Sequence, residues 1–86
     1  MWSVEFNDAS AKAFRKLDGK TQRAVKSKLQ ELQALQNPGV HAKPLMHDLK
    51  GRWRLRMGGY RIIFSLERQR MLILVVDIGR RDDIYG

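Results

Sequence analysis

Two stretches of alternating apolar and polar residues, separated by Gly58-Gly59, constrain the fold more than any other feature of the chain. Side chains point alternately to the two faces of a β-strand, so a period of two is typical of strands with one buried face. A Gly-Gly pair suits the two-residue turn of a β-hairpin. The segment from Arg52 to Leu66 is therefore predicted to be a hairpin. Its predicted facing pairs are Met57 with Tyr60, Arg56 with Arg61, Leu55 with Ile62 and Trp53 with Phe64.

Two further segments are predicted to be strands. Residues 2–6 alternate in the same way, which indicates a half-buried strand near the N-terminus. Residues 71–78 form an almost unbroken apolar run, which is typical of a central strand covered on both faces. Together with the hairpin, these strands predict a twisted antiparallel sheet of about four strands.

Two amphipathic helices are predicted between the first strand and the hairpin. Asn7 and Asp8 can cap the first helix, and Asp18-Gly19 is expected to end it. The second helix spans about residues 20–36 and keeps its apolar residues on one face. Residues 38–51 are interpreted as a long connection. This order predicts an α+β fold, in which the N-terminal strand and a helical hairpin pack on one face of the sheet.

The size and composition of the chain restrict its class. Its 86 residues support a single domain, residues 1–86. Seventeen lysines and arginines against nine aspartates and glutamates give a net charge of +8, which favours a nucleic acid or an acidic protein as partner. The absence of cysteine excludes disulfides and thiolate metal sites and fits a reducing cytosol. Because no signal-peptide pattern and no membrane-length apolar run occurs, we expect a cytoplasmic protein without a membrane partner.

The predicted hairpin gathers arginines on one face. Arg54, Arg56 and Arg61 fall opposite the apolar pairs, with Arg56 and Arg61 directly across from each other. A guanidinium group binds phosphate through paired hydrogen bonds and stays charged at any working pH, so the pattern predicts a phosphate site. The same arginines can instead pair with carboxylates and solvate an exposed face. The candidate carboxylates are Glu5, Asp77, Asp82 and Asp83.

Residues outside the hairpin are further candidates for binding the anion or a nucleic acid. Arg80 and Arg81 follow the last strand and can close over the same anion, while Tyr85 either stacks on a base or holds the tail as an apolar clip. His41 and His47 lack metal-ligand spacing and are interpreted as solvated rather than catalytic. The basic residues of the two helices are interpreted as solvated, with contact to ribosomal RNA as the alternative. They are Arg15, Lys16, Lys20, Arg23, Lys26 and Lys28.

Several motifs follow one another in the order of a known family. They are Leu49-Lys50-Gly51, Trp53-Arg54-Leu55-Arg56, Gly59-Tyr60-Arg61 and Arg80-Arg81, with Tyr85 near the end. Taken over the whole chain, they resemble the RelE/ParE toxin superfamily. The resemblance implies the RelE-like α+β fold. RelE-like members are ribosome-dependent endoribonucleases that cut messenger RNA without a metal ion, whereas ParE-like members poison DNA gyrase.

The resemblance also implies roles for individual residues. Arg54 and Arg56 stand where RelE has two strand lysines, so Arg56 takes the place of the suspected general base. Arg61 matches an arginine that contacts the phosphate and the transition state, and Arg81 matches the best candidate acid. Tyr85 matches a tyrosine that stacks on or orients the base. These four catalytic candidates, Arg56, Arg61, Arg81 and Tyr85, are joined by the expected RNA-binding residues Arg52, Arg54 and Arg80.

The same resemblance shows where the sequence departs from one branch of the family, and it implies which partners the protein binds. The YoeB branch places a carboxylate before a Pro-Leu pair and a histidine before the final tyrosine, where this chain has Lys43 and Ile84. The expected partners are a cognate acidic antitoxin, the ribosome and messenger RNA, with oligomers formed only through the antitoxin complex. We expect neither a cofactor nor a metal ion. The alternative functions are gyrase inhibition and a binding module that only engages the antitoxin.

Overall fold

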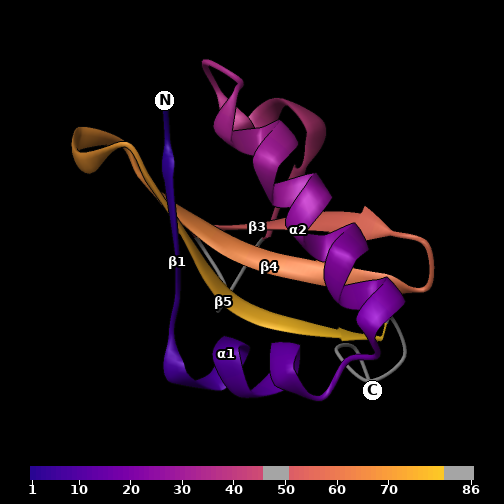
Figure 1. The fold of residues 1–86 in the computed structure, drawn as a ribbon. Coiled ribbons are helices and arrows are strands. Elements are labelled where there is room, and N and C mark those ends of the chain that lie inside the picture. The colour runs from indigo at the N-terminus through magenta and orange to yellow at the C-terminus, as the bar shows by residue number, and fades with distance from the viewer. Residues whose placement is uncertain (46–50, 81–86) are drawn as a thin grey trace.

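The computed structural model describes residues 1–45 and 51–80. Five strands form one sheet in the order β1-β5-β4-β3-β2, and the two helices pack on it (Figure 1). The α+β prediction is confirmed. The elements are β1 (Ser3–Phe6), α1 (Asp8–Arg15), α2 (Gly19–Gln33), the 3-10 turn η1 (Pro38–His41), β2 (Lys43–Pro44), β3 (Arg52–Met57), β4 (Tyr60–Glu67), the 3-10 turn η3 (Arg68–Arg70) and β5 (Leu72–Arg80).

The β3–β4 hairpin has the predicted register. Met57 faces Tyr60 across the turn, and Arg56 faces Arg61. Gly58 has a φ of 59°, a left-handed conformation that glycine adopts without steric cost. Leu55 and its neighbours on the same face lie in the hydrophobic core. The apolar alternation therefore sets which face of the hairpin is buried.

Strand β5 lies between β1 and β4, as the apolar run of residues 71–78 predicts. It runs antiparallel to β4 but parallel to β1, so the sheet is mixed rather than entirely antiparallel. A β-bulge leaves Val76 without a cross-strand partner, because Ile63 pairs with Asp77 and Phe64 pairs with Val75. Residues three positions apart in a regular strand point to opposite faces. The extra residue of the bulge lets Val75 and Ile78 both reach the core.

The two helices begin at side-chain caps. Asn7 accepts a hydrogen bond from the Ser10 N–H, and Asp18 accepts one from the Thr21 N–H, both at 2.8 Å. Asp18 therefore caps α2, whereas we predicted that it ends α1, which stops at Arg15. No helix within residues 1–45 and 51–80 is long and apolar enough to cross a membrane.

The core lies between α2 and the sheet. Helix α2 crosses the sheet in Figure 1 and contributes three residues at spacings of four and three. This spacing places them on one side of the helix. They are Val25, Leu29 and Leu32, and they pack with Leu55, Ile62, Phe64, Ile73, Val75 and Ile78 of the sheet.

The segment after α2 contains more structure than the predicted long connection. Pro38 and Gly39 of η1 are buried, and the Gly39 backbone lies against the Trp53 ring. Strand β2 follows directly and pairs with the outer edge of β3, with Lys43 opposite Arg54. A two-residue strand that includes a proline shows no alternation, which explains why the sequence did not predict a fifth strand.

Candidate functional site

Four cations from three neighbouring strands share one face of the sheet. Lys43 faces Arg54 across β2 and β3, and Arg56 faces Arg61 across β3 and β4. Leu55 points to the core, so its neighbours in β3 point to the opposite face, away from α2. We refer to Lys43, Arg54, Arg56 and Arg61 as the cationic cluster.

The arginines of the cationic cluster differ in burial. Arg61 lies on β4, the middle strand, and is only 6% exposed. Arg54 is half-buried and Arg56 is exposed. A buried guanidinium group has few alternative conformations. It also remains charged, because its pKa is far above the pH at which proteins function. The cluster therefore combines a fixed charge at the centre of the sheet with a solvent-facing charge at its edge.

The pairing geometry brings Arg56 and Arg61 close together. Residues that flank a two-residue hairpin turn exchange backbone hydrogen bonds, so the next pair, Arg56 and Arg61, does not. Side chains of such a pair start about 5 Å apart. Two like charges at this position favour an anion that bridges them. Phosphate fits this requirement.

A small pocket adjoins the cluster. It has a volume of about 160 Å³, several times the roughly 30 Å³ that a water molecule occupies, and can accommodate a phosphate group. Two of its residues, His41 and Lys43, were not among the predicted site residues, and His41 was expected to be merely solvated. The pocket is lined by His41, Lys43, Arg54 and Arg56.

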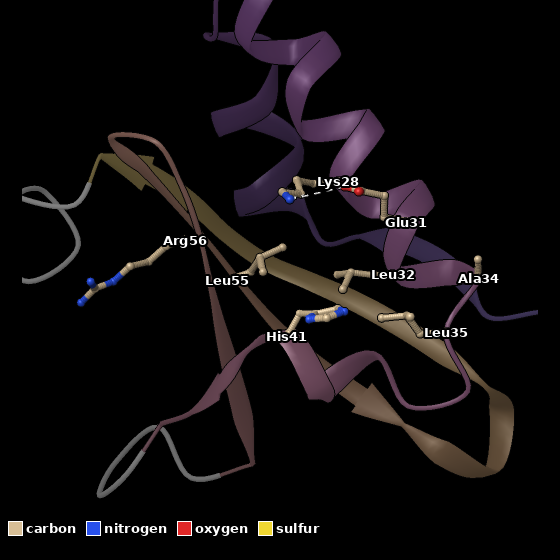
Figure 2. Close-up of a pocket in the computed structure, with 8 residues that line it drawn as sticks. All are labelled: Lys28, Glu31, Leu32, Ala34, Leu35, His41, Leu55 and Arg56. Atoms are coloured by element: carbon tan, nitrogen blue, oxygen red, sulfur yellow. Dashed lines mark ion pairs between the residues drawn. The ribbon is translucent and has the colours of Figure 1, made fainter.

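A second cleft, of about 600 Å³, lies between α2, η1 and β3 (Figure 2). Leu55 points toward α2 in Figure 2, whereas the guanidinium group of Arg56 points away from the other labelled side chains. This difference is expected of consecutive residues in a strand. Arg56 therefore contributes to the edge of the cleft from the opposite face of the sheet. The lining residues are Lys28, Glu31, Leu32, Ala34, Leu35, His41, Leu55 and Arg56.

The other predicted residues lie elsewhere or outside the described part. Arg52 is exposed and faces Ser65, about 13 Å along β3 from Arg56. Arg80 faces Tyr60, and its guanidinium lies 5.8 Å from the centre of the Tyr60 ring. Tyr60 alternates with Arg61, so this cation–π pair belongs to the helix-bearing face. The candidates Arg81 and Tyr85, together with His47, Asp82, Asp83 and Ile84, lie outside the described residues.

Two of the carboxylates that were considered as partners, Glu5 and Asp77, lie within the described residues. Asp77 faces Ile63 across β4 and β5, which places it on the same face of the sheet as Arg61. Glu5 lies on β1 and is separated from β4 by β5. Asp77 accepts a hydrogen bond from the Ile78 N–H at 2.9 Å. Two ion pairs lie away from the cationic cluster, Lys28 with Glu31 on α2 and Arg70 with Glu67 beside η3. No group of three potential metal ligands occurs within residues 1–45 and 51–80.

Solved structures with a similar architecture include toxins, both free and in complex with antitoxins. The fold is similar to that of the toxin–antitoxin complex RelBE2 from Mycobacterium tuberculosis, with a TM-score of 0.83, 22% identity and coverage of 93% of this chain and 91% of that one. It is also similar to the isolated Escherichia coli RelE toxin, with a TM-score of 0.76, 20% identity and coverage of 99% and 92%. The chain therefore has the fold of these solved toxin structures.

The family follows from the sequence comparison. The family model described as the ParE toxin of the type II toxin–antitoxin system parDE matches residues 4–85, and the chain belongs to this family. It is also 28% identical to the mRNA interferase toxin RelE of Escherichia coli over 87 residues, which cover 96% of this chain and 88% of that protein. The resemblance to the RelE/ParE superfamily is confirmed.

Proposed function

We propose that this toxin is a ribosome-dependent endoribonuclease that cleaves messenger RNA without a metal ion and thereby inhibits translation in the cytoplasm. The observation that carries the proposal is the cationic cluster, in which the buried Arg61 faces Arg56 beside a pocket of phosphate size. The similarity to RelE proteins described as mRNA interferases supports the choice of substrate.

The proposed reaction needs three functions from the protein. The RNA 2′-oxygen attacks the neighbouring phosphorus and loses its proton, and the 5′-oxygen departs and gains one. Between these steps the phosphorane carries additional negative charge. Arg61 is suited to stabilise that charge, because its burial fixes the guanidinium before the substrate arrives. Arg54, Arg56 and Lys43 then bind the phosphates on either side.

The reaction also needs an acid and a base, and an arginine-rich site supplies them in different ways. An arginine is almost fully protonated near pH 7, so it is a poor base. By resemblance we assign the acid to Arg81 and the stacking role to Tyr85, with Arg56 in the position of the base. Arg52 and Arg80 are assigned to more distant RNA phosphates.

The primary experiment compares induced wild-type protein with Arg61→Ala by mapping messenger RNA 5′ ends. We expect new ends within reading frames for the wild type and a loss of about 10²–10³-fold in cleavage for the variant, as for removal of one transition-state donor. Arg70→Ala is the control, because Arg70 is an exposed arginine at the far end of β4 and β5. Retained cleavage in folded Arg61→Ala would refute the assignment.

Gyrase inhibition is the second candidate, because the matching family model is described as a ParE toxin. A gyrase inhibitor would produce DNA breaks and growth arrest while messenger RNA stays intact. The same induction experiment therefore separates the two functions. Absence of growth arrest would favour a module that only binds the antitoxin.

We also propose a cognate acidic antitoxin as partner. Structural neighbours from Methanococcus jannaschii and Pyrococcus horikoshii are RelB–RelE complexes, with TM-scores of 0.71 and 0.73. The net charge of +8 suits an acidic partner, since complementary charge raises the association rate and disfavours other partners. Oligomers of the toxin are expected to form only through this complex.

A further inference from the structure

We propose that Asp77 is the general base of the RNA cleavage reaction, the group that takes the proton from the attacking 2′-hydroxyl. The inference rests on the proposed function, because it names a catalytic residue for that reaction. The cationic cluster itself is poorly suited to this role, since lysine and arginine side chains are protonated near pH 7. Arg56 stands in the position of the base by resemblance, and the same limit applies to it.

The register of the sheet places Asp77 beside Arg61. Asp77 faces Ile63 across β4 and β5, and Gly79 faces Arg61 two positions further along. Residues two apart in a strand point to the same face, so Asp77 and Arg61 share the face that points away from α2. They occupy diagonal positions, which lie roughly 7–8 Å apart in a sheet, within reach of a long side chain.

Gly79 determines which side chains surround the position opposite Arg61. Because glycine has no side chain, the residues of β4 and β5 that flank this position on the same face are Arg61 and Asp77. A phosphate that the Arg61 guanidinium holds there lies next to the Asp77 carboxylate. The attacking 2′-hydroxyl belongs to the ribose attached to that phosphate, so binding of the phosphate brings the hydroxyl to the carboxylate.

The Asp77 carboxylate is exposed and held in place at the same time. Its Oδ1 accepts a hydrogen bond from the Ile78 N–H at 2.9 Å, which restricts the side chain. The second oxygen, Oδ2, is then the proton acceptor. Two other carboxylates on the described part of this face are farther from Arg61. Glu67 lies six positions along β4, roughly 20 Å away, and Glu5 lies on β1, beyond β5.

The proposed step moves one proton and exchanges one bond. The 2′-oxygen gives its proton to Oδ2 of Asp77, and its electron pair forms the new bond to phosphorus. The bond between phosphorus and the 5′-oxygen breaks, and that oxygen takes a proton from the acid, which is assigned to Arg81 by resemblance. The products are a 2′,3′-cyclic phosphate and a 5′-hydroxyl. Asp77 then releases its proton to water, and the acid regains one.

The negative charge of Asp77 makes a catalytic role distinguishable from RNA binding, because a carboxylate repels the RNA backbone. Asp77→Asn keeps an oxygen that can accept the Ile78 N–H but cannot serve as a base. We expect kcat for cleavage of ribosome-bound messenger RNA to fall by about 10²–10⁴-fold, the usual contribution of a general base, while KM stays equal or decreases.

Glu5→Gln is the matched control. It neutralises a carboxylate on the same face but two strands from Arg61, and it should leave kcat and KM within about twofold of the wild type. Thermal unfolding of each variant shows whether the chain is folded.

Chemical rescue separates a base from a carboxylate with a structural role. Asp77→Ala removes the carboxylate, and added formate supplies a small carboxylate that can enter the same space. We expect formate to restore cleavage by Asp77→Ala in proportion to its concentration, whereas chloride at the same ionic strength does not. Arg61→Ala should gain nothing from formate, because it lacks the group that holds the phosphate.

Three outcomes would overturn the assignment of Asp77 alone. These are wild-type kcat in Asp77→Asn, a loss that appears only in KM, and a folded Asp77→Ala that formate does not reactivate. In each of them the wild type still cleaves, so the proposed function stands. Intact messenger RNA after incubation with the wild type would instead refute the proposed function, and the role of Asp77 with it.

Discussion

Arg61 is buried in the middle strand and lies directly opposite the exposed Arg56, in a cross-strand pair that exchanges no backbone hydrogen bonds. Like charges in such a pair destabilise a sheet. A phosphate anion between the two guanidinium groups would offset this repulsion. A residue that improves folding at this position is expected to impair anion binding.

Arg56→Glu tests this relationship directly. An opposite charge facing Arg61 should raise the free energy of unfolding by about 0.2–1 kcal/mol, or a few degrees in Tm, and should abolish RNA cleavage. Arg52→Glu is the matched control, because Arg52 is also exposed on β3 but faces Ser65. Melting at low and high salt measures the effect, which should shrink as salt screens the charges. Equal changes in the Tm of both variants would contradict the relationship.

The arginine pair also shows how much of the site can be predicted from sequence. Apolar alternation and the Gly58-Gly59 turn together fix the register of the hairpin, because a shift by one residue would expose the whole apolar face. The register in turn predicts that Arg56 and Arg61 meet. Local pattern is sufficient here because the two strands are adjacent in the chain.

The contribution of η1 and β2 could not be predicted in the same way. Lys43 joins the cluster through a two-residue strand that has too few residues to show a period. His41 reaches the pocket because η1 packs against the Trp53 ring, a contact between segments 14 positions apart in sequence. Arg80 illustrates the opposite case, since its position after the last strand suggested the anion site but the alternation along β5 directs it to Tyr60.

Ser10→Ala is expected to lower the free energy of unfolding by about 1–2 kcal/mol. The Ser10 hydroxyl is fully buried and donates a hydrogen bond of 2.7 Å to the Val75 carbonyl, which joins α1 to β5. The loss stays moderate because the Asn7 N–H also donates to that carbonyl. Urea unfolding of Ser10→Ala and of Ser27→Ala, at an exposed position of α2, provides the comparison. Similar small losses in both would show that the buried hydroxyl adds no stability.

The Asp18 cap predicts a dependence of stability on pH. Hydrogen bonds from the side chain and the backbone N–H of Thr21 lower the pKa of the Asp18 carboxyl below its ordinary value. A carboxyl whose pKa is lower in the folded state stabilises the protein above about pH 4, and this contribution is lost as the pH falls through the folded pKa. Asp18→Asn keeps a capping oxygen but cannot titrate.

Thermal melts of wild type and Asp18→Asn between about pH 2 and 7 measure this contribution. The difference in Tm should favour the wild type near neutral pH and should narrow toward the acid end. A difference that is constant over the whole range would show that the Asp18 charge is not the cause.

Gly39→Ala should disturb the small pocket that is lined by His41, Lys43, Arg54 and Arg56, although Gly39 itself does not line it. A Cβ at residue 39 would come within 2.9 Å of the Trp53 ring, which is too close for a real contact, so the ring or η1 must shift. We expect a loss of about 1–3 kcal/mol in the free energy of unfolding, as for other overpacked sites, and displacement of His41 in the same turn. Gly59→Ala is the control, because a Cβ there meets no atom within 4 Å. Urea unfolding and the indole N–H resonance of Trp53 measure both effects. If Gly39→Ala keeps wild-type stability and the same Trp53 resonance, then the close packing of η1 against β3 does not position His41.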